Sequence, residues 1–317
     1  MTDRAHPGAR HGPRPTAVSV LGGDQAWQGR PDPDQWKDPA VGIPRYTLND
    51  GTTIPAIGLG TYSFRGDAGV GALVDALGAG YRLLDSAFHY DNEGAVGAAV
   101  RTCGIPREEI VVTSKLVGRY HAHDAAVAAV EESVLRMGLD SIDLYLIHWP
   151  LPRIGLYVEA WRALIECRER GLVRSIGVSN FLPEHLDRLE RETGVVPAVN
   201  QVELHPWLPQ VEQQAYHEAH GIRTEAWAPV GEDSGLRDEP VIAEIAAAHG
   251  VTPTQVILRW DVERGIVPLP KSWSAGHRRE NLDVFGFTLA ADEVAALTAL
   301  GRAHRLFGAD PATHEEL

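Results

Sequence analysis

The most constraining feature of this sequence is a regular alternation of short and long apolar segments that begins near Tyr46. The short runs cover residues 54–60, 81–85, 109–115, 141–149, 173–179, 198–204, 221–227 and 265–271. The longer stretches between them carry apolar residues at steps of three and four, as at Val127, Val130 and Val134, which is typical of one helix face. Eight strand–helix repeats predict an α/β fold, a closed (β/α)8 TIM barrel with its helices outside.

A doubly wound parallel sheet is the main alternative for such a chain. A dinucleotide-binding sheet of that kind usually carries G-x-G-x-x-G directly after its first strand. The segments Gly58-Leu59-Gly60 and Gly78-Ala79-Gly80 both lack the third glycine at the required spacing. The sequence therefore favours the barrel.

Local turn and capping signals add detail at the two ends of the barrel. Asn49-Asp50-Gly51 separates two β-rich runs, which predicts a hairpin that plugs the amino-terminal end of the barrel. Thr252, Pro253 and Gln255 form a helix start, with Thr252 as the N-cap of a capping box. We also expect a C-terminal helix or tail over the barrel, with the residues after Leu300 as that tail.

Residues 1–44 differ in composition from the rest of the chain. They hold seven of the 21 prolines, and their five basic and five acidic side chains cancel. Such a segment buries too little surface to offset its ordering entropy. We expect a disordered or loosely docked extension, with a partner-binding arm as the alternative, followed by one barrel domain over residues 45–317.

Composition restricts the partners and the compartment. The formal net charge is −14, which opposes binding to nucleic acid or to anionic membranes. Cys103 and Cys167 are too few for a disulfide framework, and no apolar stretch approaches the roughly 20 residues of a membrane-spanning helix. The amino terminus lacks the apolar core of a signal peptide. We expect a cytoplasmic protein, and nothing in the sequence requires more than a monomer.

Four reactive side chains follow three consecutive predicted strands. Asp85 and Tyr90 follow the second run, Lys115 ends the third, and His148 ends the fourth. In a parallel barrel these positions meet at the carboxyl-terminal rim. An ammonium held by a carboxylate lowers the pKa of a neighbouring phenol, and a neutral imidazole can orient a carbonyl oxygen. The set is suited to protonating a carbonyl oxygen while a nicotinamide delivers hydride to the carbon.

The motifs that carry these residues resemble the aldo-keto reductase family. They are RLLDSAFHYDNEGAVG (82–97), VVTSK (111–115), DLYLIHWP (143–150), SIGVSNF (175–181), VNQVELHP (199–206) and PLPKSW with ENL (268–282). The runs ENLDVFGF and GVVPAVNQVELHP further resemble the bacterial 2,5-diketo-D-gluconate reductase branch. The resemblance implies an NADP(H)-dependent oxidoreductase that reduces an aldehyde or ketone, such as a keto-sugar acid or another small carbonyl compound.

The resemblance also implies roles for individual residues. Tyr90 matches the general acid, Lys115 and Asp85 the pair that tunes its pKa, and His148 the histidine that orients the substrate, whose pocket Tyr62 and Trp149 would line. The residues that match the cofactor site are Ser179, Asn180 and Gln201 at the nicotinamide carboxamide, Trp227 against its ring, Lys271 and Ser272 at the 2′-phosphate, and Glu280 and Asn281 at the adenine end.

One position departs from the family pattern at the cofactor site. The family usually has an arginine six residues after Lys271, whereas this chain has His277, followed by Arg278 and Arg279. A mostly neutral imidazole there replaces a permanent charge beside the 2′-phosphate. We expect NADP(H) as the cofactor and NAD(H) to be accepted as well.

Three other interpretations remain open at the level of sequence. A nucleotide-binding barrel without turnover would keep the fold, although a pure binder need not retain both Tyr90 and Lys115. A glycosidase would need two carboxylates over the mouth, and the fourth run ends in His148 rather than an acid. His121-Ala122-His123-Asp124 has an acceptable spacing for a metal, but we interpret these as surface histidines on one loop and predict no metal site.

Overall fold

The structure is a computed structural model that describes residues 42–302 and 305–316. The extension predicted for residues 1–44 therefore lies outside the described residues, apart from its last three. Of these, Ile43 is 4% exposed and packs against Ile57, Leu258 and Val284. The folded core thus begins slightly before the predicted boundary at residue 45.

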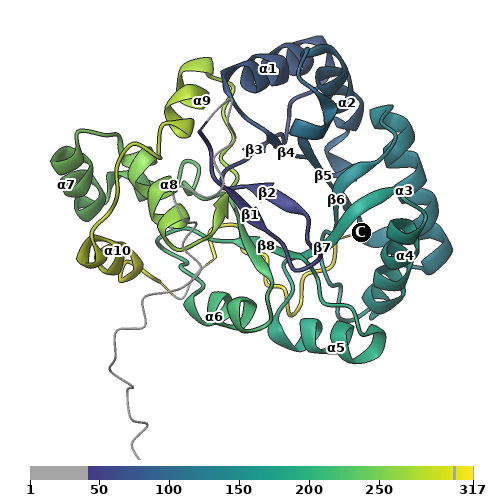
Figure 1. Ribbon diagram of the computed structural model, residues 1–317. Helices are drawn as coiled ribbons and strands as arrows, with labels where there is room; N and C mark the ends of the chain where they lie inside the picture. The colour runs from purple at the N-terminus through teal and green to yellow at the C-terminus, as the bar shows by residue number, and fades with distance from the viewer. Residues whose placement is uncertain (1–41, 303–304, 317) are drawn as a thin grey trace, which may run out of the picture.

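Eight parallel strands form the centre of the molecule, in the sequential order expected of a barrel (Figure 1). They are β3 (Leu59–Gly60), β4 (Leu83–Asp85), β5 (Val111–Leu116), β6 (Ile142–Ile147), β7 (Val173–Ser179), β8 (Val199–Glu203), β9 (Arg223–Trp227) and β10 (Val267–Pro268). Seven of the eight predicted runs contain one strand each, and β5 ends one residue beyond the run 109–115. The predicted (β/α)8 barrel is confirmed.

The first and last strands close the ring through a few backbone contacts. Gly58 N–H donates to the carbonyl of Pro268 at 3.0 Å, and Gly60 N–H donates to that of Pro270 at 3.1 Å. Proline has no N–H to return. A Cβ on Gly58 would lie 2.6 Å from side-chain atoms of Leu83 and Leu269. Gly58 therefore has no room for a side chain, because the Leu83 and Leu269 side chains fill the space beside it.

Ten helices surround the strands in the part of the chain that the structure describes. They are α1 (Gly66–Ala79), α2 (Glu93–Thr102), α3 (His123–Met137), α4 (Tyr157–Glu169), α5 (Pro183–Thr193), α6 (Val211–Ala219), α7 (Pro240–His249), α8 (Pro253–Glu263), α9 (Ala275–Leu282) and α10 (Ala291–Thr298). Helices α7 and α10 contact each other outside the ring, beyond α8 in Figure 1.

The predicted helix signals are confirmed. Val130 and Met137 of α3 are buried in the main core, and Val127 and Val134 pack against it. Thr252 caps α8 by accepting from Gln255 N–H, and the Gln255 side chain accepts from Thr252 N–H at 3.0 Å.

A hairpin closes one end of the barrel, as predicted. Strands β1 (Arg45–Thr47) and β2 (Thr53–Pro55) pair antiparallel around Asn49-Asp50-Gly51, and in Figure 1 they lie across the middle of the ring. Tyr46 and Ile54 pack against residues at the starts of several barrel strands. The predicted first run, 54–60, is wrong as a single strand, because Ile54 and Pro55 belong to this hairpin and only Leu59 and Gly60 join the barrel.

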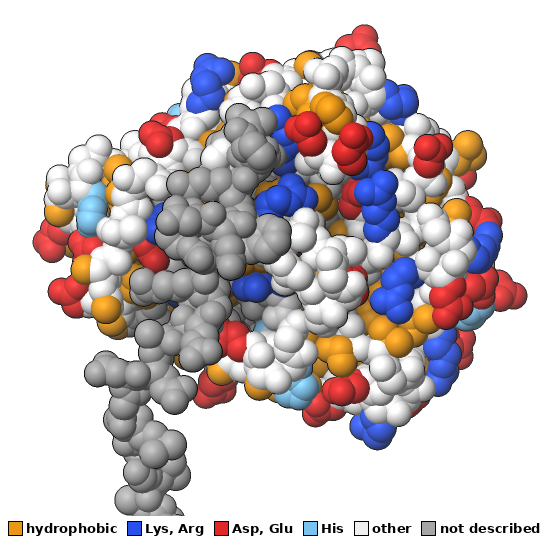
Figure 2. Space-filling model, in the orientation of Figure 1, with side chains coloured by type: hydrophobic (Ala, Val, Ile, Leu, Met, Phe, Trp, Pro, Cys, Tyr) orange, Lys and Arg blue, Asp and Glu red, His pale blue; other side chains and the backbone are white. Residues whose placement is uncertain are grey.

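The face that carries the hairpin shows both signs of charge. Lys and Arg side chains lie among Asp and Glu side chains over the helices at its edge (Figure 2), so neither sign forms a continuous patch there. Among the described residues, no single helix is long and apolar enough to cross a membrane, although α7 and α8 taken together, bent by 90°, pass on length and composition.

Candidate active site

The four predicted catalytic residues meet at the end of the barrel opposite the hairpin. Asp85 is the last residue of β4, Lys115 lies near the end of β5, and His148 directly follows β6. Tyr90 ends a single 3-10 turn that follows β4. Since β4, β5 and β6 pair in parallel, their carboxyl ends present these groups at one rim.

Asp85 and Lys115 form a buried ion pair. Lys115 Nζ lies 2.7 Å from each carboxylate oxygen of Asp85 and donates to the backbone carbonyl of Ser86 at 2.8 Å. Burial by itself would lower the pKa of Lys115, but Asp85 and then Tyr90 raise it above its usual value. The ammonium is therefore charged inside the barrel at neutral pH.

Tyr90 lies beside this ion pair. Lys115 Nζ is 5.2 Å from the centroid of the Tyr90 ring. Burial raises the pKa of Tyr90, and Lys115 lowers it, with a net value above the ordinary one. The effect of Lys115 has the sign expected from the sequence, but burial outweighs it. The phenol consequently holds its proton at neutral pH, as a proton donor must.

A second buried carboxyl group lies beneath the ion pair. Gln201 Nε2 donates to Asp85 Oδ1 at 2.9 Å and to Glu225 Oε2 at 2.8 Å, so the Gln201 amide bridges two acids. Burial, and then the charge of Asp85, raises the pKa of Glu225 to about 8. Sequence reasoning missed Glu225. The signal was its place two residues before Trp227, which puts both side chains on one face of β9.

The predicted carboxamide-binding residues are linked by hydrogen bonds. Asn180, with φ of +62°, donates to the carbonyl of His148 and to Ser179 Oγ, both at 3.0 Å. Trp227 Nε1 donates to Asn180 Oδ1 at 2.9 Å. Asparagine is among the few residues that adopt this left-handed conformation readily. The ends of β6, β7 and β9 are thereby held together.

A cavity of about 430 Å³ leads from Tyr90 and Asp85 along the ends of the strands. It is lined by several residues predicted to bind cofactor or substrate, namely Tyr62, Trp227, Lys271, Ser272 and His277. Tyr62 is 53% exposed, and its ring meets that of Tyr90 edge-on at 5.1 Å. Glu232, Asp233 and Arg237 also line the cavity. Its length and its basic end suit an elongated ligand that carries phosphate.

Eight predicted site residues do not line this cavity, namely Lys115, His148, Trp149, Ser179, Asn180, Gln201, Glu280 and Asn281. The Thr252 hydroxyl donates to Glu280 Oε1 at 2.7 Å, and Asn281 is buried next to Tyr81. Neither Glu280 nor Asn281 lines the cavity. Trp149 is buried next to His148, and its ring meets that of His314 at 4.3 Å.

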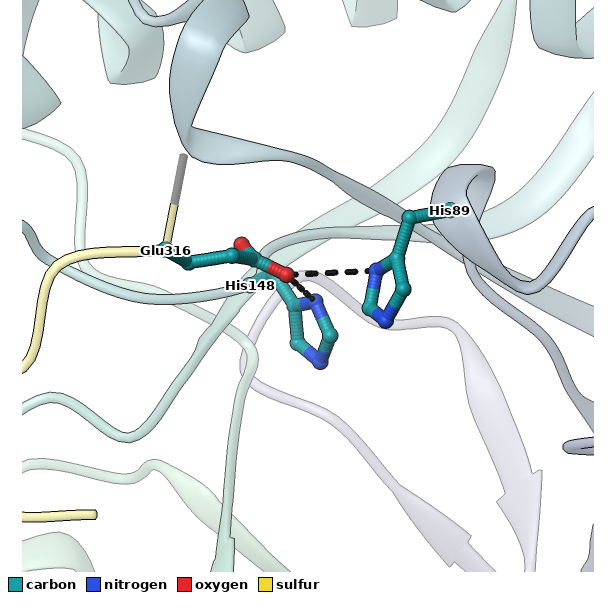
Figure 3. Close-up of side chains that lie close together, drawn as sticks. All are labelled: His89, His148 and Glu316. Atoms are coloured by element: carbon teal, nitrogen blue, oxygen red, sulfur yellow. Dashed lines mark ion pairs between the residues drawn. The ribbon is translucent and has the colours of Figure 1, made fainter.

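The C-terminal tail reaches the same rim, by a path that could not be read from the sequence. Figure 3 shows one oxygen of the Glu316 carboxylate facing a ring nitrogen of both His148 and His89. Glu316 Oε1 lies 2.7 Å from His148 Nδ1 and 3.2 Å from His89 Nδ1. Phe307, earlier in the tail, packs on Trp227 with ring centroids 5.1 Å apart. The expectation of a tail over the barrel is confirmed, and the tail adds a carboxylate next to His148.

The loop with metal-like spacing differs from its prediction. His121 is 1% exposed, so the interpretation of both histidines as surface residues is wrong for His121. His123 is the first residue of α3, and its Nδ1 lies 3.1 Å from Asp124 Oδ1. The His121 ring is therefore buried, whereas the His123 ring lies at the start of α3.

Comparison with known proteins gives a consistent result. The model of the Aldo/keto reductase family matches residues 56–302. The chain is 54% identical over 275 residues to 2,5-diketo-D-gluconic acid reductase B of a Corynebacterium species, covering 87% of this chain and 99% of that one. It is 42% identical over 265 residues to methylglyoxal reductase DkgA of Escherichia coli K12, covering 83% and 95%. The narrower resemblance predicted from the sequence is confirmed.

Solved structures match over the same region. A mutant of Gox0644 in complex with NADPH superposes with a TM-score of 0.82 at 41% identity, covering 86% of this chain and 99% of that one. An aldo-keto reductase of Bombyx mori in complex with NADP gives 0.78 at 35% identity, covering 83% and 94%. Both likenesses cover more than four fifths of this chain.

Proposed function

The chain belongs to the aldo/keto reductase family, and from that premise we propose that it is an NADP(H)-dependent reductase of small aldehydes or ketones with Tyr90 as general acid. The observation that carries the proposal is the contact of Asp85, Lys115 and Tyr90 at one end of the cavity. A phenol that is protonated and faces an open cavity is suited to proton donation.

The residues present fit a dinucleotide phosphate. Lys271 and His277 line the cavity and supply nitrogen donors for a phosphate group. The Trp227 ring also lines the cavity and offers a flat apolar face. Solved relatives hold NADPH or NADP. A reduced nicotinamide bound here supplies the hydride. Ser179, Asn180 and Gln201 are the proposed contacts of its carboxamide, and Glu280 and Asn281 those of the adenine end.

Protein side chains supply and direct the proton. The carbonyl oxygen accepts a hydrogen bond from Tyr90, which transfers its proton as negative charge develops on that oxygen. Lys115 stabilises the phenolate that remains, and Asp85 holds Lys115 in place. His148, with Tyr62 and Trp149, orients the substrate beside Tyr90.

A Tyr90→Phe variant tests the general acid. We expect turnover to fall about 100- to 10,000-fold, because a positioned proton donor contributes about that much. NADPH binding, followed by quenching of tryptophan fluorescence, should be unchanged. Near-full turnover of this variant would contradict the proposal.

A Lys115→Met variant tests the pair that tunes Tyr90. Without the ammonium, the Tyr90 phenolate loses its stabilising charge, so turnover should fall as for Tyr90→Phe. Because Lys115 is buried against Asp85, thermal melting of the variant is required to show that it is folded.

Cofactor preference follows from the position of His277. Since Lys271 keeps one cation at the 2′-phosphate site, NADPH is the first cofactor, and the imidazole of His277 leaves room for NADH. We expect catalytic efficiencies with the two cofactors to differ by less than about 1,000-fold, or about 4 kcal/mol. A larger preference for NADPH at low salt would refute mixed use.

A nucleotide-binding barrel without turnover is the second candidate. Oxidation of NADPH with a panel of carbonyl compounds separates the two. The panel should include 2,5-diketo-D-gluconate and methylglyoxal, because two relatives carry those substrates in their names. Binding of NADPH without oxidation for any compound would favour the second candidate.

We further propose a cytoplasmic monomer without nucleic-acid or membrane partners. Every group in the proposed site comes from one chain, so a second copy is not needed for the chemistry. Cys103 and Cys167 are both free, which is typical of a reducing compartment. Light scattering of the eluting protein should give a mass near the 34.5 kDa of one chain.

A further inference from the structure

His89, His148 and Glu316 form a cluster that the proposed reaction does not explain. One ligand-type atom from each lies within 4.8 Å of the other two. The two imidazole rings stack at 4.8 Å between centroids and 25° between planes, with both Nδ1 atoms next to Glu316 Oε1 (Figure 3). Three elements far apart in sequence thus place two nitrogens and one oxygen around one point.

The two nitrogens lack the contacts that would normally occupy them. Both Nδ1 atoms are buried, and among the described residues neither makes a well-directed hydrogen bond, although Glu316 lies within ion-pair distance. A neutral imidazole has a lone pair available for a cation.

Glu316 is held on the cluster by the surrounding tail. Gly118 N–H points to Glu316 Oε2 at 3.4 Å, and a Cβ on Gly118 would lie 2.2 Å from the backbone oxygen of Glu316. Arg153 N–H donates to Glu315 Oε1 at 3.1 Å. The glycine permits this close approach of the tail to the rim. The carboxylate is therefore held in place by contacts of the tail that do not involve the histidines.

We propose that His89, His148 and Glu316 bind one divalent transition-metal ion of the Zn²⁺ class. Zinc lies about 2.0–2.1 Å from imidazole nitrogen and about 2.0–2.2 Å from carboxylate oxygen, which separates two such ligands by about 3.4 Å in a tetrahedron. The observed nitrogen–oxygen distances of 2.7 and 3.2 Å need to open only slightly. Two imidazoles and one carboxylate favour Zn²⁺, Ni²⁺ or Cu²⁺ over Mg²⁺, and leave a fourth position to water.

The bound ion joins the tail to the rim of the barrel. His89 lies edge-on to Tyr90, with ring centroids 4.9 Å apart, so the cross-link forms next to the proposed general acid. A tail fixed there restricts access of a carbonyl compound to Tyr90. Zn²⁺ is therefore a reversible inhibitor of the reductase. This inhibition rests on the proposed function, whereas binding of Zn²⁺ to the cluster does not depend on it.

Titration of the metal-free full-length chain with Zn²⁺, followed by calorimetry, tests the site. We expect one ion per chain, no comparable binding of Mg²⁺, and an absorption spectrum of four-coordinate Co²⁺ when Co²⁺ is used as the probe. Glu316→Gln should weaken Zn²⁺ binding more than about tenfold, since even the loss of a group that only supports a ligand costs about that much.

Two matched variants serve as controls. Glu315→Gln removes the same charge from the adjacent tail residue, which contacts a backbone N–H rather than the histidines, and should bind Zn²⁺ as the wild type does. His123→Ala removes a surface histidine that lies near Asp124 and Glu166, and should also leave the affinity unchanged. Equal losses for Glu315→Gln and Glu316→Gln, or retention of affinity in Glu316→Gln, would overturn the site.

Inhibition is measured separately from binding. NADPH oxidation should fall as Zn²⁺ saturates the wild type, and Glu316→Gln should require more than about ten times as much Zn²⁺. Equal inhibition of both proteins would refute the cross-link. If no carbonyl compound is reduced by the metal-free protein, the proposed function fails while the titration still decides the metal site.

Discussion

At the scale of single residues, the net charge of the buried groups at the rim depends on which of them hold their protons. Lys115 and Asp85 are both charged and satisfy each other at 2.7 Å. Glu225 lies on the same amide of Gln201 as Asp85, and two adjacent buried carboxylates cannot both ionise cheaply. Glu225 therefore keeps its proton at neutral pH, and the buried set carries no net charge.

The raised pKa of Glu225 makes the stability of the fold depend on pH. The pKa is about 8 when folded against an ordinary value of 4.5, so the native state binds more protons between these two pH values. The free energy of unfolding therefore falls as pH rises from 4.5 through 8. Glu225→Gln should remove this loss, which is on the order of 5 kcal/mol when complete. Chemical denaturation at pH 5, 7 and 9 measures it.

The comparison needs an exposed carboxyl group as its control. Glu244 lies exposed on α7, and Glu244→Gln should follow the wild type at each pH. A Glu225→Gln protein whose stability declines with pH as steeply as the wild type would show that Glu225 ionises freely in the native state.

Residue-level prediction succeeded where position in the strand order determined the outcome. Asp85, Lys115 and His148 were found because strand ends in a parallel barrel share a rim. Glu225 was missed because an acidic residue inside a strand has only one sequence signal, the face of the strand on which its position places it. Glu316 was not placed because the path of a tail depends on tertiary contacts, here with Gly118.

At the scale of elements, helix α8 shows how a local signal becomes a tertiary contact. Thr252 accepts from Gln255 N–H and, through its hydroxyl, donates to Glu280 in α9. The cap thus satisfies a free N–H of α8 and ties α8 to the next helix. The capping box was predictable from four consecutive residues, whereas the bond to Glu280 was not.

Removing this cap should weaken the fold measurably. Thr252→Ala deletes the hydroxyl and should lower the free energy of unfolding by about 1–2 kcal/mol, as measured by urea denaturation. Thr252→Ser retains the hydroxyl and should remain close to the wild type. Equal stabilities of the alanine and serine variants would show that the hydroxyl contributes nothing.

The boundaries of elements were the least predictable feature. The run 54–60 has no polar residue, so its hydrophobic pattern does not locate the break between β2 and β3. The break arises because the hairpin needs Ile54 against the bottom of the barrel, while Leu59 pairs beside β4. Competition between two tertiary partners decides where one strand ends.

At the scale of the whole molecule, closure of the ring depends on the contact between its first and last strands. Gly58→Ala places a methyl group 2.6 Å from Leu83 and Leu269. Overpacking of this kind costs about 1–3 kcal/mol, so we expect the free energy of unfolding to fall by that amount. Thermal and urea denaturation of the variant measure the change.

A second glycine gives a control of opposite sign. Gly71 is exposed in α1, and a Cβ there would meet nothing within 4 Å. Gly71→Ala should raise the free energy of unfolding by about 0.5–1 kcal/mol, because alanine has the higher helix propensity. If Gly58→Ala and Gly71→Ala both raise the free energy of unfolding, the space at Gly58 does accommodate a methyl group and the proposed clash is wrong.

The number and order of the barrel strands were predictable because eight repeats impose one closed arrangement. The placement of α7 and α10 outside the ring was not, because nothing in their periodicity distinguishes them from the helices that cover strands.

The hairpin at the base of the barrel has a consequence for the order of events at the opposite end. The barrel interior is packed with side chains and the hairpin covers its other end, so ligands reach the cavity only from the side of the strand ends. When two ligands bind there together, the outer one blocks dissociation of the one that lies deeper along the strand ends. The ligand that binds last must then dissociate first, so the shape of the rim alone imposes an order of binding and release.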